Sequence, residues 1–308
     1  MPELCVVIVS YNTKLLLLRC LASLTEASAE AGISTEVIVV DNGSVDGSVA
    51  AVDAAYPAVR VITSQTNLGF AGANNLAFPR SVAPVTLLLN SDAFINAEAL
   101  RRATQLLRTA PEVGVVGMQI VNLDGTFQAA YGRFPTFWDD LCTSLGLDRL
   151  LPHQQAIATR IGPVDWVHGA CMFVRTGALA QVGALDERFF MYSEEVDWCR
   201  RFWSFGWEVW YLGDMTIQHV GGASRDSDLR RRTALYRGRL GMRRRFGGPF
   251  ASLFLWLGII VGLVMRIFMR AFVGAVLHRR LGRQSPQSDW ALAREIARMD
   301  PLARWAVS

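Results

Sequence analysis

One stretch decides the fold: Val85-Thr86-Leu87-Leu88-Leu89-Asn90-Ser91-Asp92. Its first five residues are almost all apolar, and such a run is typical of a strand that is buried on both faces of a sheet. The run ends abruptly in a polar triplet with one carboxylate. Because ligands of open α/β sheets bind just past the carboxyl ends of the strands, Asp92 is predicted to lie where such a sheet holds a metal or a charged substrate.

Strands and helices alternate through the first part of the chain. Strands are expected at 4–9, 37–40, 59–62 and 85–89, and helices at 14–30 and 71–77. Strand–helix alternation with short connections predicts a parallel sheet with right-handed crossovers. We therefore expect an α/β fold with a Rossmann-like, mostly parallel sheet and flanking helices.

Two other strands end in polar residues as the strand at 85–89 does. The first runs into Ser10-Tyr11-Asn12 and the second into Asp41-Asn42-Gly43-Ser44. Since the carboxyl ends of parallel strands meet at one edge of a sheet, the three polar ends are expected to line a single crevice. Asp41 is suited to accept a hydrogen bond from a nucleobase or a ribose hydroxyl, although these residue types are also what a tight turn requires.

Two features near this edge suit a phosphorylated ligand. The glycine-containing loop at 67–75 enters a helix, so its backbone N–H groups either face a phosphate or simply begin the helix. Asp92 offers the carboxylate oxygen that Mg²⁺ or Mn²⁺ prefers, unless it only caps the helix expected to start near Ala97.

The pattern changes after residue 110. Strands with glycine interruptions are expected at 113–121 and 164–174, a helix at 193–205, and short strands at 208–212 and 215–219. We interpret residues 111–224 as a second half that is packed on the same sheet as residues 1–110. His219 ends the last strand, and a lone histidine in this position is more often structural than a ligand.

The helix expected at 193–205 opens with an acidic cluster of Glu194, Glu195 and Asp197. Acids are favoured in the first turn by the helix dipole, but this effect explains one or two of them rather than three among so many aromatics. A carboxylate at this position can act as a general base. The helix N-terminus lowers the pKa of such a group, whereas its acidic neighbours raise it.

Residues 225–308 differ in character from the rest. Arginines crowd 225–245 against two acids, which suits phosphate or an anionic membrane surface. Residues 250–265 are apolar apart from Ser252, and Arg266 and Arg270 then interrupt on one helix face. An arginine near the centre of a membrane span costs about 2.5–3.5 kcal/mol. An interfacial or re-entrant helix therefore fits better than a clean span, with a buried core helix or a tilted span as alternatives.

The composition indicates a cytosolic protein with a sizeable core. The chain has 308 residues, of which 51% are hydrophobic, and a net charge of +4. The five cysteines are scattered and include no Cys-x-x-Cys pair, which argues for reduced thiols and against structural zinc. The N-terminus has no basic region or cleavage site, so no secretory signal is expected.

In combination and order, these motifs resemble the family 2 glycosyltransferases, which have the GT-A fold. The nearest likeness is to bacterial rhamnosyltransferase-like members that build cell-surface polysaccharides. The matching segments are 6–12, 41–44, 67–71, 89–93, 169–172, 190–200, and His219 with Gly222 and Ser224. The resemblance implies a GT-A catalytic domain at 1–224, with a nucleotide-sugar-binding half at 1–110 and an acceptor-side half at 111–224. A basic, apolar, membrane-associating helical tail would follow at 225–308.

The resemblance also implies a donor site and a metal site. The donor, a nucleoside diphosphate sugar, would be bound by Ser10, Tyr11, Asn12, Asp41, Asn67, Gly69, Asn74, Asn90 and Ser91. Asn90 stands where the family's D-x-D-type motif has its first acid. A divalent metal, Mg²⁺ or Mn²⁺, would therefore be held by Asp92 with His219 as a helper.

Glu195 stands where the family often has the Asp of a Glu-Asp pair. The resemblance makes it the catalytic base, with Glu194 and Asp197 as rivals for this role. Three further residues, Asp165, Trp166 and His168, would face the acceptor.

The implied reaction is an inverting transfer of a sugar, with rhamnose as one candidate, to a lipid-linked or polysaccharide acceptor. The chain lacks the Gln-x-x-Arg-Trp motif of processive synthases, so single-sugar addition is expected. The basic, apolar tail would bring the site to a polyprenyl-linked acceptor at the cytoplasmic face of the cell membrane.

Three other functions were weighed. A nucleotidylyltransferase usually has a basic glycine-rich loop after its first strand, where this chain has Tyr11-Asn12-Thr13-Lys14. A non-catalytic, membrane-associated binder of sugar nucleotides would have no turnover for Glu195 to support. A nucleic-acid partner is not expected, because the arginines lack interleaved aromatic residues for stacking.

Overall fold

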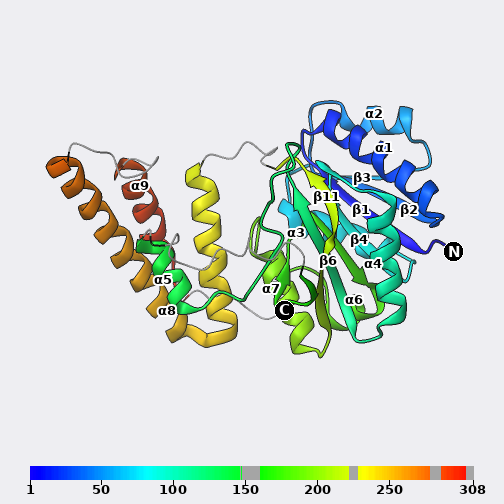
Figure 1. Cartoon of the computed structure of the whole chain (residues 1–308). Coiled ribbons are helices and arrows are strands. Elements are labelled where there is room, and N and C mark those ends of the chain that lie inside the picture. The colour runs from blue at the N-terminus through cyan, green and yellow to red at the C-terminus, as the bar shows by residue number, and fades with distance from the viewer. Residues whose placement is uncertain (146, 148–159, 222–227, 278–285, 303–308) are drawn as a thin grey trace. The chain divides into compact units, whose positions relative to one another are not determined.

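A computed structural model describes residues 1–145, 147, 160–221, 228–277 and 286–302 (Figure 1). The chain forms two compact units. Unit 1 comprises Met1–Phe134 and Gln154–Arg225, and unit 2 comprises Pro135–His153 and Asp226–Ser308. Residues 135–153, placed by the sequence in the acceptor-side half, thus group with the C-terminal tail. Gly222, Ser224 and Arg225, which belong to the predicted motifs, lie outside the described residues.

Unit 1 is built around a mixed sheet. Among the described residues its strands are β1 (Leu4–Ser10), β2 (Thr35–Asp41), β3 (Arg60–Thr63), β4 (Val85–Asn90), β5 (Ala93–Phe94), β6 (Val113–Val121), β8 (Ile161–Pro163), β10 (Cys171–Arg175) and β11 (Glu208–His219). Their order is β3-β2-β1-β4-β10-β6-β11-β5, and β8 pairs with β11. The first four strands are parallel, β6 and β11 are parallel, and β10 runs antiparallel to its neighbours. The predicted α/β architecture is confirmed.

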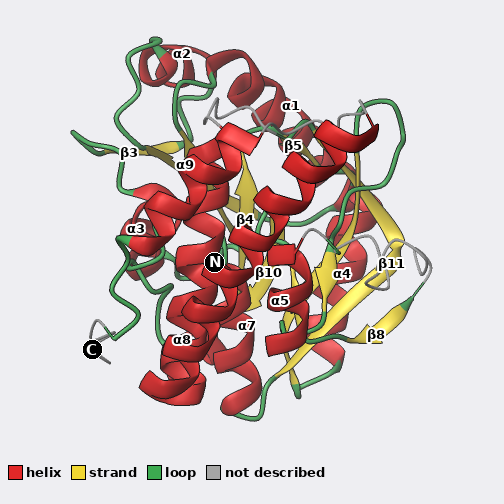
Figure 2. Cartoon of the chain, turned by 90° about the vertical axis from the view of Figure 1, so that its left-hand side faces the viewer, coloured by secondary structure: helices red, strands yellow, loops and turns green. Residues whose placement is uncertain are grey.

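Helices cover both faces of this sheet (Figures 1 and 2). They are α1 (Lys14–Ala31), α2 (Ser48–Ala55), α3 (Gly69–Ala77), the short 3₁₀ helix η1 (Phe78–Arg80), α4 (Ala97–Thr109), α6 (Thr176–Val182) and α7 (Glu194–Ser204). Alternate residues of β1 enter two different cores: Val6 and Ile8 pack in the cluster that contains residues of α1 and α4, whereas Val7 packs with residues of α3. This burial on both faces is the reason why the strands are continuous apolar runs.

The predicted polar strand ends lie side by side. In the parallel pairing of β1 with β2, Ser10 stands opposite Asp41, and in the pairing of β1 with β4, Val9 stands opposite Asn90. The three polar ends therefore meet at one edge of the sheet, as predicted.

Two predicted strand boundaries were wrong. The stretch at 164–174 is divided into β9 (Trp166–Val167), which pairs with β7 (Tyr131–Gly132), and β10. It divides because the backbone leaves β9 at His168, whose N–H donates to the Ala130 carbonyl, and joins β4 where Ala170 accepts from Asn90 N. The two strands expected at 208–219 are one strand, β11, which stays paired with β6 through a register shift between Leu212 and Thr216.

Unit 2 is helical. It contains α5 (Phe137–Leu145), α8 (Asp228–Leu277) and α9 (Pro286–Ala297). The helix α5 was not predicted from the sequence, although Thr136 and Asp139 exchange hydrogen bonds at its start in the manner of a capping box. Gly248, with φ 82°, and Pro249 divide α8 into a basic first half and an apolar second half.

The stretch Leu229–Phe272 of α8 is long and apolar enough to cross a membrane by length and composition, a property that core helices of soluble proteins share. One face of its second half packs in a core with α9, through Leu255, Ile259 and Leu263 against Leu292 and Ile296.

Candidate active site

A chain of hydroxyl groups joins the ends of β1 and β4. The Thr13 hydroxyl lies 3.0 Å from Ser10 Oγ and 2.9 Å from Ser91 Oγ. Asn12, which has a left-handed φ of 53°, is fixed against the end of β2, because its N–H donates to Ser44 Oγ at 2.9 Å. These contacts hold three predicted donor-binding residues in one rigid rim, while Tyr11 is exposed beside them.

Asp41 is a buried carboxylate with one unused oxygen. Its Oδ2 accepts a hydrogen bond from Ser44 N at 3.1 Å, whereas its Oδ1 is buried and has no partner. Leaving a buried acceptor unsatisfied costs about 1–3 kcal/mol. The ring N–H of a nucleobase is the kind of donor that would satisfy this oxygen.

Asn42, which was not among the predicted site residues, holds the 67–69 loop in place. Its side-chain amide donates to Asn67 Oδ1 at 3.0 Å and to the Gly69 carbonyl at 3.1 Å, and its Oδ1 accepts from Leu68 N at 2.8 Å. Asn42 thus attaches the 67–69 loop to the end of β2. The sequence signal was present, because Asn42 follows Asp41 directly, but it was interpreted as turn chemistry.

Asp92 and His219 come together although 127 positions separate them in the chain. The sheet brings them into contact because β5 and β11 pair with Ala93 opposite His219. Asp92 Oδ1 lies 3.2 Å from His219 Nε2, and Asp92 Oδ2 accepts from Gly221 N at 3.1 Å. The helix α4 is capped instead by Asn96, whose side chain accepts from Ala99 N, so Asp92 does not have the capping role.

Gln128 determines the tautomer of His219. Its amide nitrogen donates to the His219 carbonyl at 2.8 Å and to Asn122 Oδ1 at 2.7 Å, so its Oε1 is the atom that faces His219 Nδ1, at 2.8 Å. That oxygen only accepts, and therefore Nδ1 carries the hydrogen. In the neutral imidazole, His219 Nε2 then carries the lone pair and lies 3.2 Å from Asp92 Oδ1, with Asn90 Nδ2 at 3.3 Å.

Two acceptors 3.2 Å apart suit a shared cation. An imidazole nitrogen and a carboxylate oxygen are both ordinary ligands of Mn²⁺, and the Gln128 contact is the outer hydrogen bond that ligating histidines commonly make. Among the described residues no group of three or more His, Cys, Asp or Glu is placed to hold a metal. A metal at this pair would therefore complete its coordination with phosphate oxygens and water.

His168 lies beside this pair. Its ring centroid is 5.9 Å from that of His219, and its Nδ1 accepts from Ala170 N at 3.0 Å, which leaves the hydrogen on Nε2. Burial lowers its pKa to about 4. His168 is therefore neutral at physiological pH and has one N–H to offer to a ligand.

The acids of α7 follow a strained turn. Tyr192 and Ser193 have φ values of 71° and 76°, a conformation that is costly for residues other than glycine and is often found at functional sites. Glu194 and Glu195 each have an Oε2 that is buried and has no partner. Burial raises the pKa of both carboxyl groups, and the charge of Glu195 raises that of Glu194 further.

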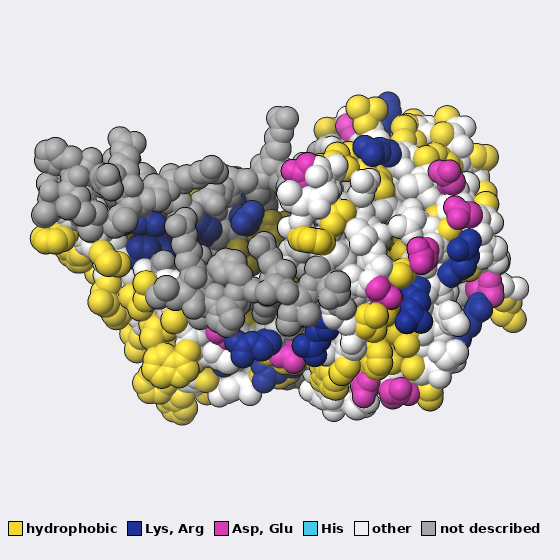
Figure 3. All heavy atoms as spheres, viewed as in Figure 1, with side chains coloured by type: hydrophobic (Ala, Val, Ile, Leu, Met, Phe, Trp, Pro, Cys, Tyr) yellow, Lys and Arg dark blue, Asp and Glu magenta, His cyan; other side chains and the backbone are white. Residues whose placement is uncertain are grey.

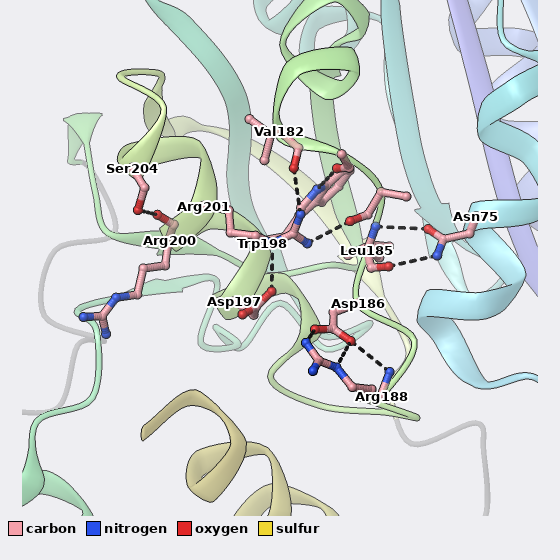
Figure 4. A network of polar contacts seen from close by, with 12 residues as sticks. Asn75, Val182, Leu185, Asp186, Arg188, Asp197, Trp198, Arg200, Arg201 and Ser204 are labelled. Atoms are coloured by element: carbon pink, nitrogen blue, oxygen red, sulfur yellow. Dashed lines mark hydrogen bonds and ion pairs between the residues drawn. The ribbon is translucent and has the colours of Figure 1, made fainter. Parts of the chain in front are cut away.

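Asp197 has a different environment from its two neighbours (Figure 4). It is fully buried and accepts from Arg201 Nε at 3.0 Å, while the other guanidinium nitrogens of Arg201 donate to the carbonyls of Val182 and Ala184. This network attaches α7 to the end of α6. The contacts give Asp197 a structural role and leave Glu194 and Glu195 as the acids with unused oxygens.

The loop at 67–69 and the first residues of α3 contact the segment that leads into α7. Phe70 N donates to the Phe190 carbonyl at 3.0 Å, and a Cβ on Gly69 would lie 2.1 Å from that oxygen. A Cβ on Gly169 would lie 3.7 Å from Glu195 Cβ. Gly69 therefore permits the close approach of Phe190, and Glu195 lies within ordinary contact distance of Gly169, just before β10 begins.

Three predicted ligand-binding residues are occupied by internal contacts. Asn74 Nδ2 donates to the Phe70 carbonyl within α3 at 2.9 Å. Asp165 accepts from Phe134 N at 2.6 Å, and Trp166 Nε1 donates to the Arg133 carbonyl at 2.9 Å. These contacts occupy the side-chain N–H groups of Asn74 and Trp166 and one carboxylate oxygen of Asp165.

One strand end of this α/β sheet carries the unsatisfied acceptor Asp41, and another is followed by Asp92, which with His219 is suited to bind a cation. These are features of a nucleotide-dependent transferase. Residues 5–184, more than half of the chain, match the family described as Glycosyl transferase family 2. The chain belongs to this family and is a glycosyltransferase.

Two curated relatives agree with this assignment. The N-acetylglucosaminyl-diphospho-decaprenol L-rhamnosyltransferase of Mycobacterium tuberculosis is 30% identical over 243 residues, which cover 70% of this chain and 75% of that protein. The low-salt glycan biosynthesis hexosyltransferase Agl10 of Haloferax volcanii is 31% identical over 170 residues, which cover 54% of this chain and 52% of that protein.

Solved structures confirm the GT-A fold. The mannosyltransferase PcManGT of Pyrobaculum calidifontis, in complex with GDP-Man and Mn²⁺, has a TM-score of 0.59 at 17% identity, covering 99% of this chain and 83% of that one. Staphylococcus aureus TarS 1–349 has a TM-score of 0.51 at 16% identity, covering 96% of this chain and 88% of that one.

Proposed function

We propose that this glycosyltransferase adds one sugar, with inversion, from a nucleoside diphosphate sugar to a lipid-linked acceptor in cell-envelope glycan synthesis. The name of the mycobacterial relative supports an N-acetylglucosaminyl-diphospho-polyprenol as the acceptor class and rhamnose as the sugar. Such acceptors are anchored in a membrane, and the proposed location is its cytoplasmic face.

The observation that carries the proposal is the convergence of three kinds of unsatisfied group on one sheet edge. These are the unpartnered oxygen of Asp41, the Asp92–His219 pair of potential cation ligands, and the half-buried Glu195 beside Gly169. In this proposal Asp41 accepts from the nucleobase, and Asn42 holds the 67–69 loop beside it. Ser10 and Ser91 line the path from the base to the diphosphate.

The metal of the proposed reaction would be held by Asp92 and His219. The chemistry that a divalent cation would supply there is neutralisation of the charge that develops on the leaving diphosphate. The Mn²⁺ of the mannosyltransferase structure supports a divalent metal in the reaction. Gln128 contributes by keeping the lone pair of His219 Nε2 directed toward the cation.

Glu195 is the proposed general base. As the acceptor hydroxyl oxygen forms a bond to the anomeric carbon, the bond from that carbon to the diphosphate oxygen breaks, and the hydroxyl proton passes to the Glu195 carboxylate. The transition state has oxocarbenium character, as in glycoside hydrolysis. Burial suits the role, because a base with a raised pKa accepts a proton more readily near neutral pH.

The buried acids favour an enzyme over a non-catalytic binder of sugar nucleotides. Two adjacent carboxylates with unpartnered oxygens disfavour the folded state, and among the described residues neither makes an ion pair of the kind that Asp197 makes with Arg201. In a protein that only binds a donor, these carboxylates would lower the stability of the fold without serving catalysis.

The test is a transfer assay on the full chain with a polyprenyl-diphosphate-linked N-acetylglucosamine, a panel of nucleoside diphosphate sugars and Mn²⁺. Glu195→Gln should lower turnover by about 10²–10⁴-fold, the usual contribution of a general base. Glu208→Gln, a change in an acid that bonds Trp210 on β11, is the matched control and should keep its activity.

A loss of turnover in Glu194→Gln with full activity in Glu195→Gln would transfer the base role to Glu194. The absence of transfer from every donor would reject the function itself.

A further inference from the structure

The second half of α8 carries a continuous apolar stripe on its exposed side (Figure 3). From 250 to 272, every exposed residue is apolar. Seven of these exposed residues repeat at helical spacing, and we call them the apolar stripe: Phe250, Phe254, Leu257, Val261, Met265, Phe268 and Phe272. Steps of three and four residues place all seven on one face of the helix.

The charges of this helix lie on the opposite face. Arg266 is buried, and its Nη2 donates to Asp289 Oδ1 of α9 at 2.9 Å. Arg270 makes an ion pair with the same carboxylate, and Arg232 from the first half of α8 reaches it at 2.9 Å. The arginines that interrupt the apolar run in the sequence therefore place no charge in the apolar stripe.

The apolar stripe is large for a protein surface. Its four phenylalanines are 63–72% exposed, so they alone present roughly 500 Å² if a free phenylalanine offers about 200 Å². The largest apolar patch on a soluble monomer is usually about 300–600 Å², and the leucine, valine and methionine of the stripe add to this area. A surface of this extent indicates a partner.

Other exposed side chains of unit 2 favour an anionic membrane as that partner. The sequence of α8 contains many arginines and a single acid, Asp228, and Arg231 and Arg237 are exposed. Trp138 of α5 and Trp290 of α9 are also exposed. Exposed arginines complement anionic headgroups, and tryptophans are enriched at the interface between membrane and water.

The structure of unit 2 favours a helix that lies in the interface over one that spans alone. One side of the apolar segment is covered by α9, whose own outer side carries Arg294 and the Arg298–Glu295 pair. These charges are unsuited to the hydrocarbon core. We propose that the apolar stripe inserts into an anionic membrane surface with the helix parallel to that surface. The proposal extends the proposed function, from which it takes the membrane as partner.

The test is flotation of the full-length protein with vesicles of phosphatidylcholine and phosphatidylglycerol, and with vesicles of phosphatidylcholine alone. The double variant Phe254→Gln/Phe268→Gln removes two exposed rings and leaves the core of unit 2 intact. It should lower partitioning into the mixed vesicles by at least about tenfold. Leu123→Gln/Phe127→Gln changes two comparably exposed residues of unit 1 and should float as the unaltered protein does.

Flotation is scored independently of catalysis. The stripe variant should retain transfer to a water-soluble acceptor analogue, so loss of flotation with retained transfer supports the proposal. If the unaltered protein floats but transfers no sugar, the proposed function is rejected, whereas the proposal that the apolar stripe binds a membrane is retained. Equal flotation of all three proteins, or a stripe-dependent dimer in sedimentation velocity without vesicle binding, would overturn the proposal.

Discussion

The contact between Gly69 and Phe190 gives a sharp test of how the site is assembled. Gly69 has a φ of 74°, and a Cβ there would lie 2.1 Å from the Phe190 carbonyl oxygen, whereas real Cβ contacts stay above 3.0 Å. In Gly69→Ala, the 189–190 backbone must therefore move by nearly an ångström. That segment precedes the strained turn at Tyr192 and Ser193, on which the position of Glu195 depends.

The expected loss of folding stability in Gly69→Ala is the sum of two costs. A left-handed conformation costs a non-glycine residue about 1–2 kcal/mol. Displacing Phe190 also weakens the hydrogen bond from Phe70 N, currently 3.0 Å, for about 1 kcal/mol more. Gly69→Ala should therefore destabilise unit 1 by about 2–3 kcal/mol. A shift of this size near the reacting groups can lower turnover by about 10²-fold.

Gly32→Ala is the matched control. Gly32 ends α1 with a φ of 67°, but a Cβ there meets nothing within 4 Å, so its substitution carries the conformational cost alone. Urea unfolding and the transfer assay should show a smaller loss of stability and unchanged turnover for this variant. The reasoning is refuted if the two alanine variants have the same unfolding free energy and the same turnover.

Three other changes have defined outcomes. Gln128→Leu removes the contact that orients His219 and should weaken Mn²⁺ binding by about 10–100-fold in calorimetry; unchanged affinity would contradict the tautomer argument. Burial favours the neutral form of Glu194 and raises its pKa in the folded protein above the ordinary value of 4.5. The protonated side chain therefore contributes fully to stability below pH 4.5, and this contribution is lost as the pH rises through the pKa of the folded protein. Glu194→Gln should therefore stabilise the fold by about 1–3 kcal/mol near neutral pH and hardly at all near pH 4, and equal melting shifts at both would count against it. Asp289→Asn removes the carboxylate that Arg232 and Arg266 share and should destabilise unit 2 by about 3–5 kcal/mol in thermal unfolding, whereas an effect no larger than that of the exposed Asp300→Asn would show that the cluster is not stabilising.

The parts of the fold that were predicted depend on local pattern. The apolar run at 85–89 has the composition of a strand buried on both faces, and strand–helix alternation implies parallel neighbours. These two rules are sufficient to bring Ser10, Asp41 and Asn90 to one edge. Asp92 and His219 were paired from the family resemblance, and the pairing of β5 with β11 provides the physical reason for their contact.

The parts that were missed depend on contacts between distant residues. Gln128 lies in a loop without periodicity, and only its contact with a residue 91 positions away shows its purpose. Asp197 looked equivalent to Glu194 and Glu195 in the sequence, and only the position of Arg201 and the end of α6 separates a structural acid from its neighbours. In the same way, the partner of Arg266 lies on α9 rather than within the apolar segment.

The central claim is that Asp92, with His219, holds the divalent cation through which a nucleoside diphosphate sugar binds at this sheet edge. The most direct measurement is calorimetric titration of the unaltered protein and of Asp92→Asn with a panel of nucleoside diphosphate sugars, with Mn²⁺ and with a chelator. The account predicts that at least one sugar nucleotide binds the unaltered protein with Mn²⁺, and that removing either the metal or the carboxylate weakens binding by at least about tenfold. Binding that is indifferent to both changes, or no binding by any member of the panel, would contradict it.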